Sequence, residues 1–174
     1  AKAAYSAYRE RAVGLGAMGF HSFLQRNSIS FEGIYATSFN NRCFKYIKEQ
    51  ADETSRTLAS VRGEAPDMDG SGRRNACLLA VAPNASSSII CGGTSPSIEP
   101  IRANIYTHKT LTGSYKVKNK YLEKLLEEKG INTKETWQEI AANEGSVQTL
   151  KYLNDDEKEI FKTAPEINQI WIIE

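Results

Sequence analysis

The sequence has 174 residues, enough for one domain with a core of its own. Hydrophobic residues make up 40% and charged residues 25%, which is typical of a globular protein and excludes a fibrous or largely disordered chain. The net charge is +1, from 22 basic and 21 acidic side chains, so no overall field attracts nucleic acid or an anionic membrane.

Three further features restrict where the protein acts. Apolar runs such as residues 78–83 are far shorter than the roughly 20 residues of a membrane helix, so no membrane partner is expected. The first residues do not predict a secretory signal, and the missing initiating Met indicates a piece of a longer protein. Cys43, Cys77 and Cys91 are spaced unlike a disulfide framework or a zinc site. We therefore expect a reducing, cytoplasmic location.

The first third of the chain is predicted to be mainly helical. Residues 3–11 favour helix, the glycine-rich stretch 14–19 interrupts it, and residues 20–24 begin a second helix. Between residues 38 and 60, apolar side chains recur at helical spacing, with charged side chains largely opposite, which predicts an amphipathic helix. The apolar positions of this helix are Phe39, Cys43, Ile47, Ala51 and Leu58.

A loop, a strand and a short helix are predicted next. Residues 63–72 combine one proline, two aspartates and three glycines, a composition typical of a loop. The near-continuous apolar run 76–82 predicts a strand buried on both faces, as in a parallel sheet that helices cover, and Pro83 ends it. Serines 86–88 then open a helix that must be short, because a glycine pair follows.

The second half of the chain alternates capped helices with one strand. Residues 115–118 alternate and predict a strand, and Asn119 is a natural N-cap for a helix over 120–129 that Gly130 closes. Two further helices and a last apolar segment are predicted to begin near Thr133, at Asn154 or Asp155, and at Pro165. Together these elements predict an α/β fold.

The segment Pro83-Asn84-Ala85-Ser86-Ser87-Ser88 is the best candidate for a binding site. It lies between the predicted strand and a helix start, where α/β sheets bind ligands. Small residues let the backbone approach an anion, and the free amides of a first helical turn and the serine hydroxyls are donors that suit a phosphate. From these local features alone, ordinary capping of the helix by Asn and Ser stays an open alternative.

Several spaced motifs occur in one order along the chain. They include Arg74-Asn75, the 83–88 segment, Ser97-Ile98-Glu99-Pro100 and Asn104-Ile105-Tyr106-Thr107, with further motifs at 11–16, 111–113, 143–148 and Lys162-Thr163. Together they resemble the carboxyl-terminal catalytic barrel of class I ribonucleotide reductase large subunits, over nearly the whole chain. The resemblance implies a helix-rich α/β segment that forms roughly the second half of a ten-stranded α/β barrel, with residues 1–174 as a single partial domain.

The resemblance also implies a function. The family reduces ribonucleoside diphosphates to deoxyribonucleoside diphosphates for DNA synthesis, and its radical cysteine, redox cysteine pair and radical-relay tyrosines have no match here. We therefore predict no catalytic residue in this chain and no activity of the chain alone. The implied role of this segment is to hold the diphosphate of the substrate through five residues, Pro83, Asn84, Ala85, Ser86 and Ser87.

The partners and cofactors implied are those of the family. They are the remainder of the large subunit, a small subunit that carries a metal-radical cofactor, and thioredoxin or glutaredoxin as the dithiol reductant. We expect no cofactor or metal in this segment, because His21 and His108 are isolated from other ligand side chains. The three cysteines are expected to be core residues without a catalytic role. Half a barrel leaves unpaired strand edges, so self-association of the isolated chain is expected.

Two alternatives stay open. Gly14-x-Gly16-x-x-Gly19 matches the dinucleotide-binding fingerprint of nicotinamide or flavin oxidoreductases. The charged, helix-prone residues before it do not predict the strand that this fingerprint requires. The second alternative is an inactive structural fragment that needs the rest of its subunit.

Overall fold

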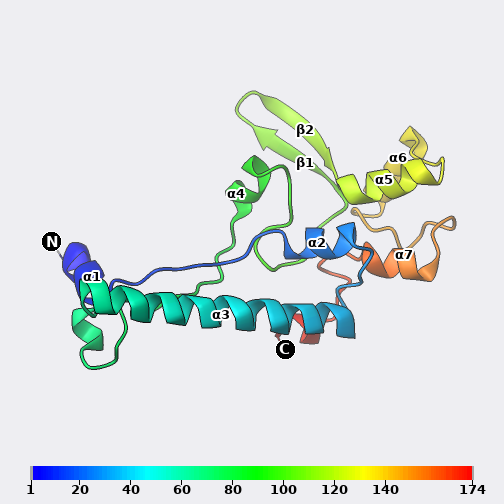
Figure 1. Ribbon diagram of the computed structural model, residues 1–174. Helices are drawn as coiled ribbons and strands as arrows, with labels where there is room; N and C mark the ends of the chain where they lie inside the picture. The colour runs from blue at the N-terminus through cyan, green and yellow to red at the C-terminus, as the bar shows by residue number, and fades with distance from the viewer. Residues whose placement is uncertain (1, 174) are drawn as a thin grey trace. The chain divides into compact units, whose positions relative to one another are not determined.

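The computed structural model describes residues 2–173. The elements, in chain order, are α1 (Lys2–Glu10), α2 (Phe20–Arg26), α3 (Ile34–Arg62), the 3-10 helix η1 (Pro66–Met68), α4 (Ala85–Ile90), β1 (Ile105–Thr110), β2 (Gly113–Lys118), α5 (Lys120–Glu128), α6 (Lys134–Ala142), α7 (Asp155–Ile160) and α8 (Ile170–Ile173) (Figure 1).

The chain divides into two compact units. The first, here called the N-unit, comprises residues 1–17 and 37–82, and the second, the C-unit, comprises residues 18–36 and 83–174. Each unit is therefore built from two separate stretches of sequence. The assignment of residues 1–174 to a single partial domain stays a prediction.

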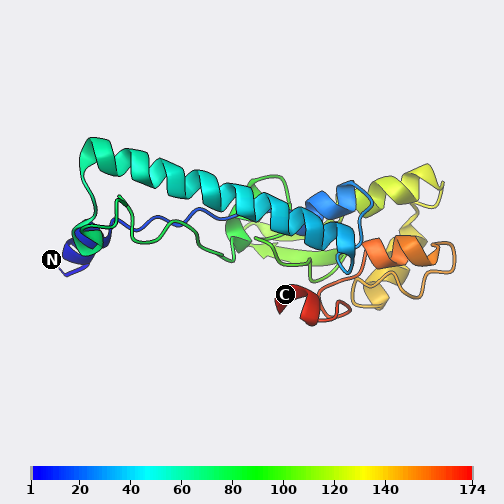
Figure 2. The same cartoon turned by 60° about the horizontal axis from the view of Figure 1, so that its bottom comes forward.

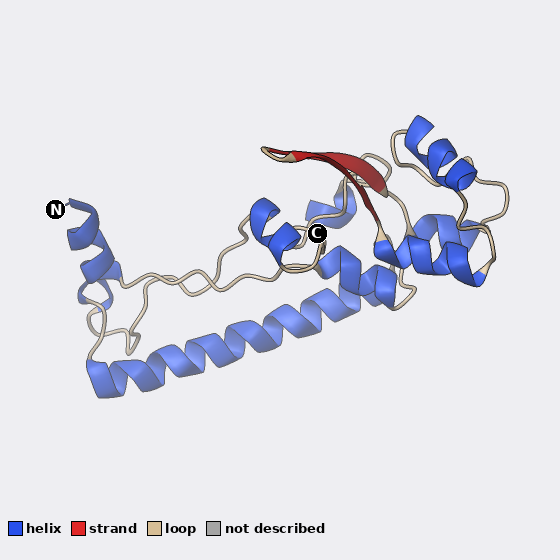
Figure 3. Cartoon of the chain, turned by 90° about the horizontal axis from the view of Figure 1, so that it is seen from above, coloured by secondary structure: helices blue, strands red, loops and turns tan. Residues whose placement is uncertain are grey.

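In the N-unit, two extended segments lie side by side. Residues 12–17 and 76–82, here called the parallel ribbon, run in the same direction and are joined by a bridge between Leu15 and Leu79 (Figure 3). The Leu15 amide donates to the Leu78 carbonyl at 2.9 Å, and the Ala80 amide donates to the Leu15 carbonyl at 3.1 Å. The two segments approach so closely that a Cβ on Gly16 would lie 2.4 Å from the Ala80 carbonyl oxygen.

The ribbon corrects one prediction. Residues 76–82 do not form the expected strand buried on both faces, because they make only an isolated bridge, and Leu79 and Val81 are 38% and 66% exposed. A buried parallel strand needs a neighbour on each side and helices over both faces. Among the described residues, the run has a single extended neighbour, residues 12–17.

The long helix α3 confirms the predicted amphipathic helix and extends beyond both of its expected ends. Its five apolar positions are only half-buried, so the described residues cover this face incompletely. Ser55 on α3 is fully buried and joins the helix to the residue directly before the ribbon segment 76–82, since its hydroxyl donates to the Asn75 side-chain oxygen at 2.9 Å. Two turns further along, the Arg74 guanidinium donates to the carbonyls of Arg62 and Gly63 and so caps the carboxyl terminus of α3.

The C-unit has two apolar clusters. The first is formed mainly by α5, α6 and the segments that follow them, which gather at one end of the unit (Figure 2). Its buried members are Ile105, Leu122, Leu126, Trp137, Ile140, Val147, Leu150, Leu153 and Phe161. The second cluster joins Leu24 of α2 to Phe31, Ala36 and Ile167.

The helices around the first cluster begin where their capping residues predict. Asn119 accepts from the Tyr121 amide at 3.1 Å, and Thr133 accepts from the Thr136 amide at 3.2 Å. Asn154, one of the two alternatives left open for the cap of α7, forms a capping box with Glu157. These local predictions are confirmed.

Strands β1 and β2 form an antiparallel hairpin in which Ile105 faces Lys118 and Thr110 faces Gly113. The prediction of a strand over 115–118 is confirmed, whereas β1 was not predicted. No helix within residues 2–173 is both long and apolar enough to cross a membrane.

Candidate functional site

The candidate loop forms the entry to α4 in the C-unit. Asn84 has a φ of 45°, in the left-handed region, and turns the chain from the extended residues before it into the helix that begins at Ala85. Pro83, Ala85, Ser86 and Ser87 are exposed, and Asn84 is half-buried.

The hydrogen-bond donors of this loop are unused. Within residues 2–173, the amides of Ala85, Ser86 and Ser87 and the hydroxyls of Ser86 and Ser87 donate no hydrogen bond. Asn84 occupies the N-cap position, yet its side chain makes no capping hydrogen bond. Capping of the helix by its own Asn and Ser side chains therefore does not consume these donors, and several of them are free to bind an anion together.

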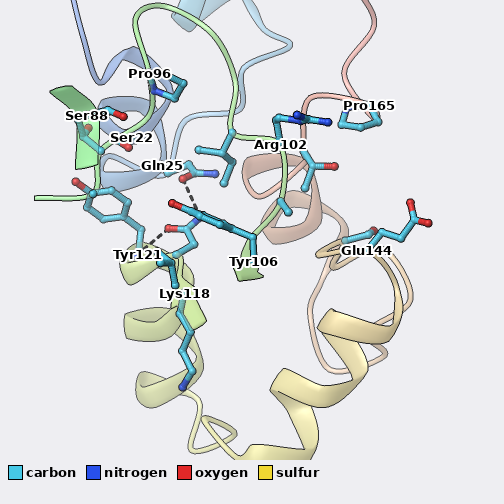
Figure 4. A pocket seen from close by; sticks show the side chains of 18 of the residues that line it. Ser22, Gln25, Ser88, Pro96, Arg102, Tyr106, Lys118, Tyr121, Glu144 and Pro165 are labelled. Carbon is cyan, nitrogen blue, oxygen red and sulfur yellow. Dashed lines mark hydrogen bonds between the residues drawn. The ribbon is translucent and has the colours of Figure 1, made fainter. Parts of the chain in front are cut away.

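A cavity of about 610 Å³ is lined in part by α4 (Figure 4). It is enclosed by α2, α4, the hairpin and the loops around residues 93–103, 143–146 and 163–166. Of the five predicted loop residues, only Ala85 lines this cavity, and the structure places the other four outside its wall. Ser88, which also lines it, is buried and donates its hydroxyl to the Ala85 carbonyl at 2.8 Å.

Two cations line the cavity, and they differ in their partners. Lys118 points its amine away from the cavity, where it pairs with Glu123 at 3.2 Å and lies 4.6 Å from the centre of the Trp137 ring (Figure 4). Arg102 is exposed, lies beside Pro165, and forms neither a hydrogen bond nor an ion pair with any residue between 2 and 173 (Figure 4).

Three side-chain amides form a network under the hairpin. Asn104 is fully buried and donates to the carbonyls of Gly145 at 3.0 Å and Phe161 at 2.8 Å. Its oxygen accepts from Asn119 at 2.8 Å, and the same Asn119 amide group donates to Gln25 of α2 at 3.0 Å. The network therefore fixes the base of the hairpin relative to α2 and to two loops of the cavity wall.

The half-buried carboxylate of Glu166 also lines the cavity, and three donors within the C-unit occupy it. Glu166 accepts from the amide and hydroxyl of Thr163 at 2.7 and 2.8 Å and from the Ser146 hydroxyl. Three donors therefore hold this carboxylate as a structural group that joins two loops.

The cysteines and histidines do not form a redox or metal site in the described residues. All three cysteines are free, and Cys77 and Cys91 are exposed, which corrects the expectation of core positions; only Cys43 is half-buried. Cys77 lies in the ribbon, and Cys91 follows the last residue of α4. Residues 2–173 contain no group of three or more His, Cys, Asp or Glu side chains that could hold a metal ion.

The glycine motif at 14–19 has a packing explanation. Helix α1 precedes it, where the dinucleotide fingerprint requires a strand. Gly16 permits the close approach to Ala80, and a Cβ on Gly19 would lie 2.6 Å from the Thr94 hydroxyl. The motif therefore serves contacts within each unit and lacks the strand-turn-helix geometry that binds a dinucleotide.

Comparison with known proteins identifies the family. The chain matches the family described as ribonucleotide reductase, barrel domain, in two overlapping stretches, residues 1–73 and 67–174. This chain belongs to the ribonucleotide reductase barrel-domain family. The resemblance seen in the sequence motifs and the fold class, a helix-rich segment of an α/β barrel, are confirmed.

Individual relatives agree with this assignment. The chain is 48% identical over 177 residues to the ribonucleoside-diphosphate reductase large subunit of Invertebrate iridescent virus 6, covering 99% of this chain and 18% of the relative. It is 31% identical to the corresponding subunit of Caenorhabditis elegans, covering 95% and 25%. The class Id ribonucleotide reductase alpha subunit of Actinobacillus ureae superimposes with a TM-score of 0.88 at 46% identity, covering 97% of this chain and 31% of that subunit. The chain thus spans less than a third of these relatives.

Sequence reasoning missed the residues that organise the cavity. Gln25, Asn104, Ser22 and Ser95 meet only through folding, so no local spacing connects them. Asn104 lay within one of the recognised motifs without a role assigned to it. That motif was the one signal that could have drawn attention to it.

Proposed function

We propose that this chain is the part of a ribonucleoside-diphosphate reductase large subunit that holds the diphosphate of the substrate. Residues Pro83, Asn84, Ala85, Ser86 and Ser87 form the binding loop. The observation that carries the proposal is the set of unused donors at the start of α4, which three amides and two hydroxyls provide within one exposed turn.

The chemistry of this loop suits a diphosphate better than a neutral ligand. Hydrogen bonds from amides and hydroxyls to a charged acceptor are about twice as strong as those between neutral groups. The short side chains at 85–87 leave the backbone accessible to phosphate oxygens. Because α4 has only six residues, its helix dipole contributes little to binding. The diphosphate would be attracted mainly by hydrogen bonds from the individual amides and hydroxyls of the loop.

The contribution of this loop to the reaction is positioning. A diphosphate held by several donors fixes the ribose against groups that other parts of the subunit supply, which lowers the entropic part of the barrier. The proposed partners are the remainder of the large subunit, a small subunit with a metal-radical cofactor, and thioredoxin or glutaredoxin as the reductant. The absence of a cofactor from this segment and a cytoplasmic location remain expectations of the same proposal.

The proposal is tested by replacing both hydroxyls in a complete large subunit that carries this segment. The double variant Ser86→Ala and Ser87→Ala loses two donors to a charged group, so the KM for the ribonucleoside diphosphate should rise roughly tenfold or more. Ser114→Ala, which removes an exposed hydroxyl on β2, is the control and should leave KM unchanged. An unaltered KM in the double variant would contradict the assignment of the loop.

Binding to the chain itself distinguishes this proposal from the two alternatives. In an NMR titration with a ribonucleoside diphosphate, the amides of Ala85, Ser86 and Ser87 should shift. At the amides of Gly14, Gly16 and Gly19, NAD should produce shifts no larger than those that the ribonucleoside diphosphate produces there. Shifts at the glycine motif with NAD alone would favour the dinucleotide alternative, and no response to either ligand would favour the inactive structural fragment.

A further inference from the structure

Helix α4 is too short to hold its own position. It has six residues, and isolated helices of that length are unstable in water. Its apolar side chains add little, since Ile89 and Ile90 are 44% and 84% exposed. The donors proposed to bind the diphosphate therefore depend on contacts made elsewhere to remain in one place.

The segment that follows α4 provides these contacts. The Gly93 amide donates to the Ile89 carbonyl at 3.3 Å, and the Thr94 amide donates to the Ser88 carbonyl at 3.1 Å. The carboxyl-terminal end of α4 is thus tied to residue 94, and the next residue along the chain is Ser95.

Ser95 and Ser22 form a reciprocal pair, here called the serine clasp. The Ser22 amide donates to the Ser95 hydroxyl at 3.0 Å, and the Ser95 amide donates to the Ser22 hydroxyl at 2.8 Å. Both residues are buried, at 5% and 1% exposure. The Gly19 amide donates to the Ser95 carbonyl at 2.9 Å and the Phe20 amide to the Ser97 carbonyl at 3.3 Å, so four hydrogen bonds join the two segments.

The clasp also completes α2. Gly19 occupies the N-cap position of this helix and has no side chain with which to cap it. Ser22 is the third residue of the helix, and its otherwise unsatisfied amide is bonded by Ser95. Ser95 therefore acts as the missing cap from 73 residues away in the sequence.

Helix α2 is a firm support for α4. His21, Leu24 and Gln25 on this helix are buried, at 0%, 0% and 4% exposure. Gln25 also joins the amide network through Asn119. Because α2 is anchored in the buried part of the C-unit, the hydrogen bonds of the serine clasp fix residue 95, and through it the end of α4, in place.

We propose that Ser95 and Ser22 are positioning residues for the diphosphate loop, which they hold by fixing the end of α4 to α2. This inference rests on the proposed function of the loop. Neither serine contacts the substrate; their hydroxyls act on binding through the placement of the amides of residues 85–87.

The first test measures the clasp itself in the 174-residue chain, by amide hydrogen exchange. Ser95→Ala leaves the Ser22 amide buried and unpaired, so the protected amides of Ser88 and Thr94 should exchange roughly fivefold faster or more. The amides of Leu126 and Ile140 in the first apolar cluster should be unaffected, which separates local loosening from loss of the fold. Unchanged exchange at Ser88 and Thr94 would overturn the proposal.

The chain contains a matched control for this substitution. Ser97 is equally buried, at 1% exposure, and its hydroxyl has no hydrogen-bond partner among the described residues. Ser97→Ala removes the same atom two residues away without removing a hydrogen bond, so exchange should not change. Ser95→Cys, which keeps the size of the side chain but accepts hydrogen bonds weakly, serves if Ser95→Ala does not fold. It should accelerate exchange at the same two amides.

The second test measures substrate use in a complete large subunit. Ser95→Ala should raise the KM for the ribonucleoside diphosphate roughly fivefold and change kcat less than twofold, while Ser97→Ala changes neither. Ser95→Thr, which retains a hydroxyl, should restore most of the binding. Faster exchange without a change in KM would overturn the positioning role. The Ser86 and Ser87 double variant decides the function of the loop separately, so the two ideas fail by different results.

Discussion

His21 is buried as an uncharged side chain in α2. Its Nδ1 accepts a hydrogen bond from the Ile101 amide at 3.0 Å, and burial lowers its pKa to about 4, an effect that the Ile160 carbonyl offsets only in part. The unfolded chain, with an ordinary histidine pKa of about 6.5, takes up a proton first as the pH falls. The contribution of His21 to stability is therefore complete above pH 6.5 and is lost as the pH falls from 6.5 towards 4.

This change can be measured by urea unfolding followed through the buried Trp137. Between pH 7.5 and pH 5 the C-unit should lose about 2 kcal/mol of unfolding free energy because of His21. His21→Asn keeps an acceptor for the Ile101 amide and cannot titrate. The unfolding free energy of this variant should therefore fall by about 2 kcal/mol less than that of the unsubstituted chain between pH 7.5 and pH 5. Equal pH dependence in the two proteins would contradict the buried neutral state.

Asn104 should be among the least replaceable polar residues. Asn104→Ala removes three side-chain hydrogen bonds inside the C-unit, to the carbonyls of Gly145 and Phe161 and from the Asn119 amide, at a cost of about 3 kcal/mol. Asn41→Ala on the exposed side of α3 is the control, and it should change stability by less than about 0.5 kcal/mol. A similar small effect at Asn104 would show that the network has little energetic weight.

Among the elements, the parallel ribbon depends on one glycine. A Cβ at position 16 would lie 2.4 Å from the Ala80 carbonyl oxygen, so Gly16→Ala must push the two segments apart. The expected loss is about 2 kcal/mol, visible as faster exchange of the Leu15 and Ala80 amides. Gly33→Ala, whose Cβ would meet nothing closer than 3.9 Å, should leave exchange of these amides unchanged.

The elements that could be predicted from the sequence are those with local signals. Asn119, Thr133 and Asn154 mark helix starts because a cap and its amide partner lie within three residues. Strand β1 was missed because it exists through its pairing with β2, and four of its six residues are exposed. The prediction of a buried strand over 76–82 was wrong for a related reason. Whether an apolar run forms a buried strand depends on neighbouring strands and helices that composition does not reveal.

The residues of the candidate site also differ in whether a local sequence signal marks them. The loop at 83–87 could be singled out as a candidate from the sequence, because small residues before a helix carry their own donors, and its role stays a prediction. Ser22, Ser95 and Asn104 could not, because each acquires its role from a residue far away in the sequence. Periodicity and spacing describe only neighbours along the chain.

For the whole molecule, we expect self-association of the isolated chain. The ribbon exposes Leu15 and Val81 at 54% and 66% and has no extended neighbour on its outer edges among the described residues. Unpaired edges with apolar side chains favour pairing with another chain. Light scattering should therefore show dimers or larger species at micromolar concentration, and a clean monomer would contradict the expectation.

A substitution pair makes this prediction specific. Val81→Lys adds a charge to the ribbon and should reduce association. Leu111→Lys adds the same charge at the fully exposed hairpin turn and should have a smaller effect. Equal effects of the two substitutions would assign the association to some surface other than the ribbon.

Residues 37–82 of the N-unit separate the two stretches of the C-unit along the sequence, and this has a consequence for synthesis. As the chain leaves the ribosome, residues 18–36 of the C-unit emerge before residues 37–82 of the N-unit, yet the rest of the C-unit begins only at residue 83. Helix α2 lacks a cap until Ser95 has been translated, 73 residues after Ser22. The C-unit thus completes its folding late, after the whole N-unit has emerged, and a nascent chain halted before Ser95 would carry α2 with its first turn open to solvent.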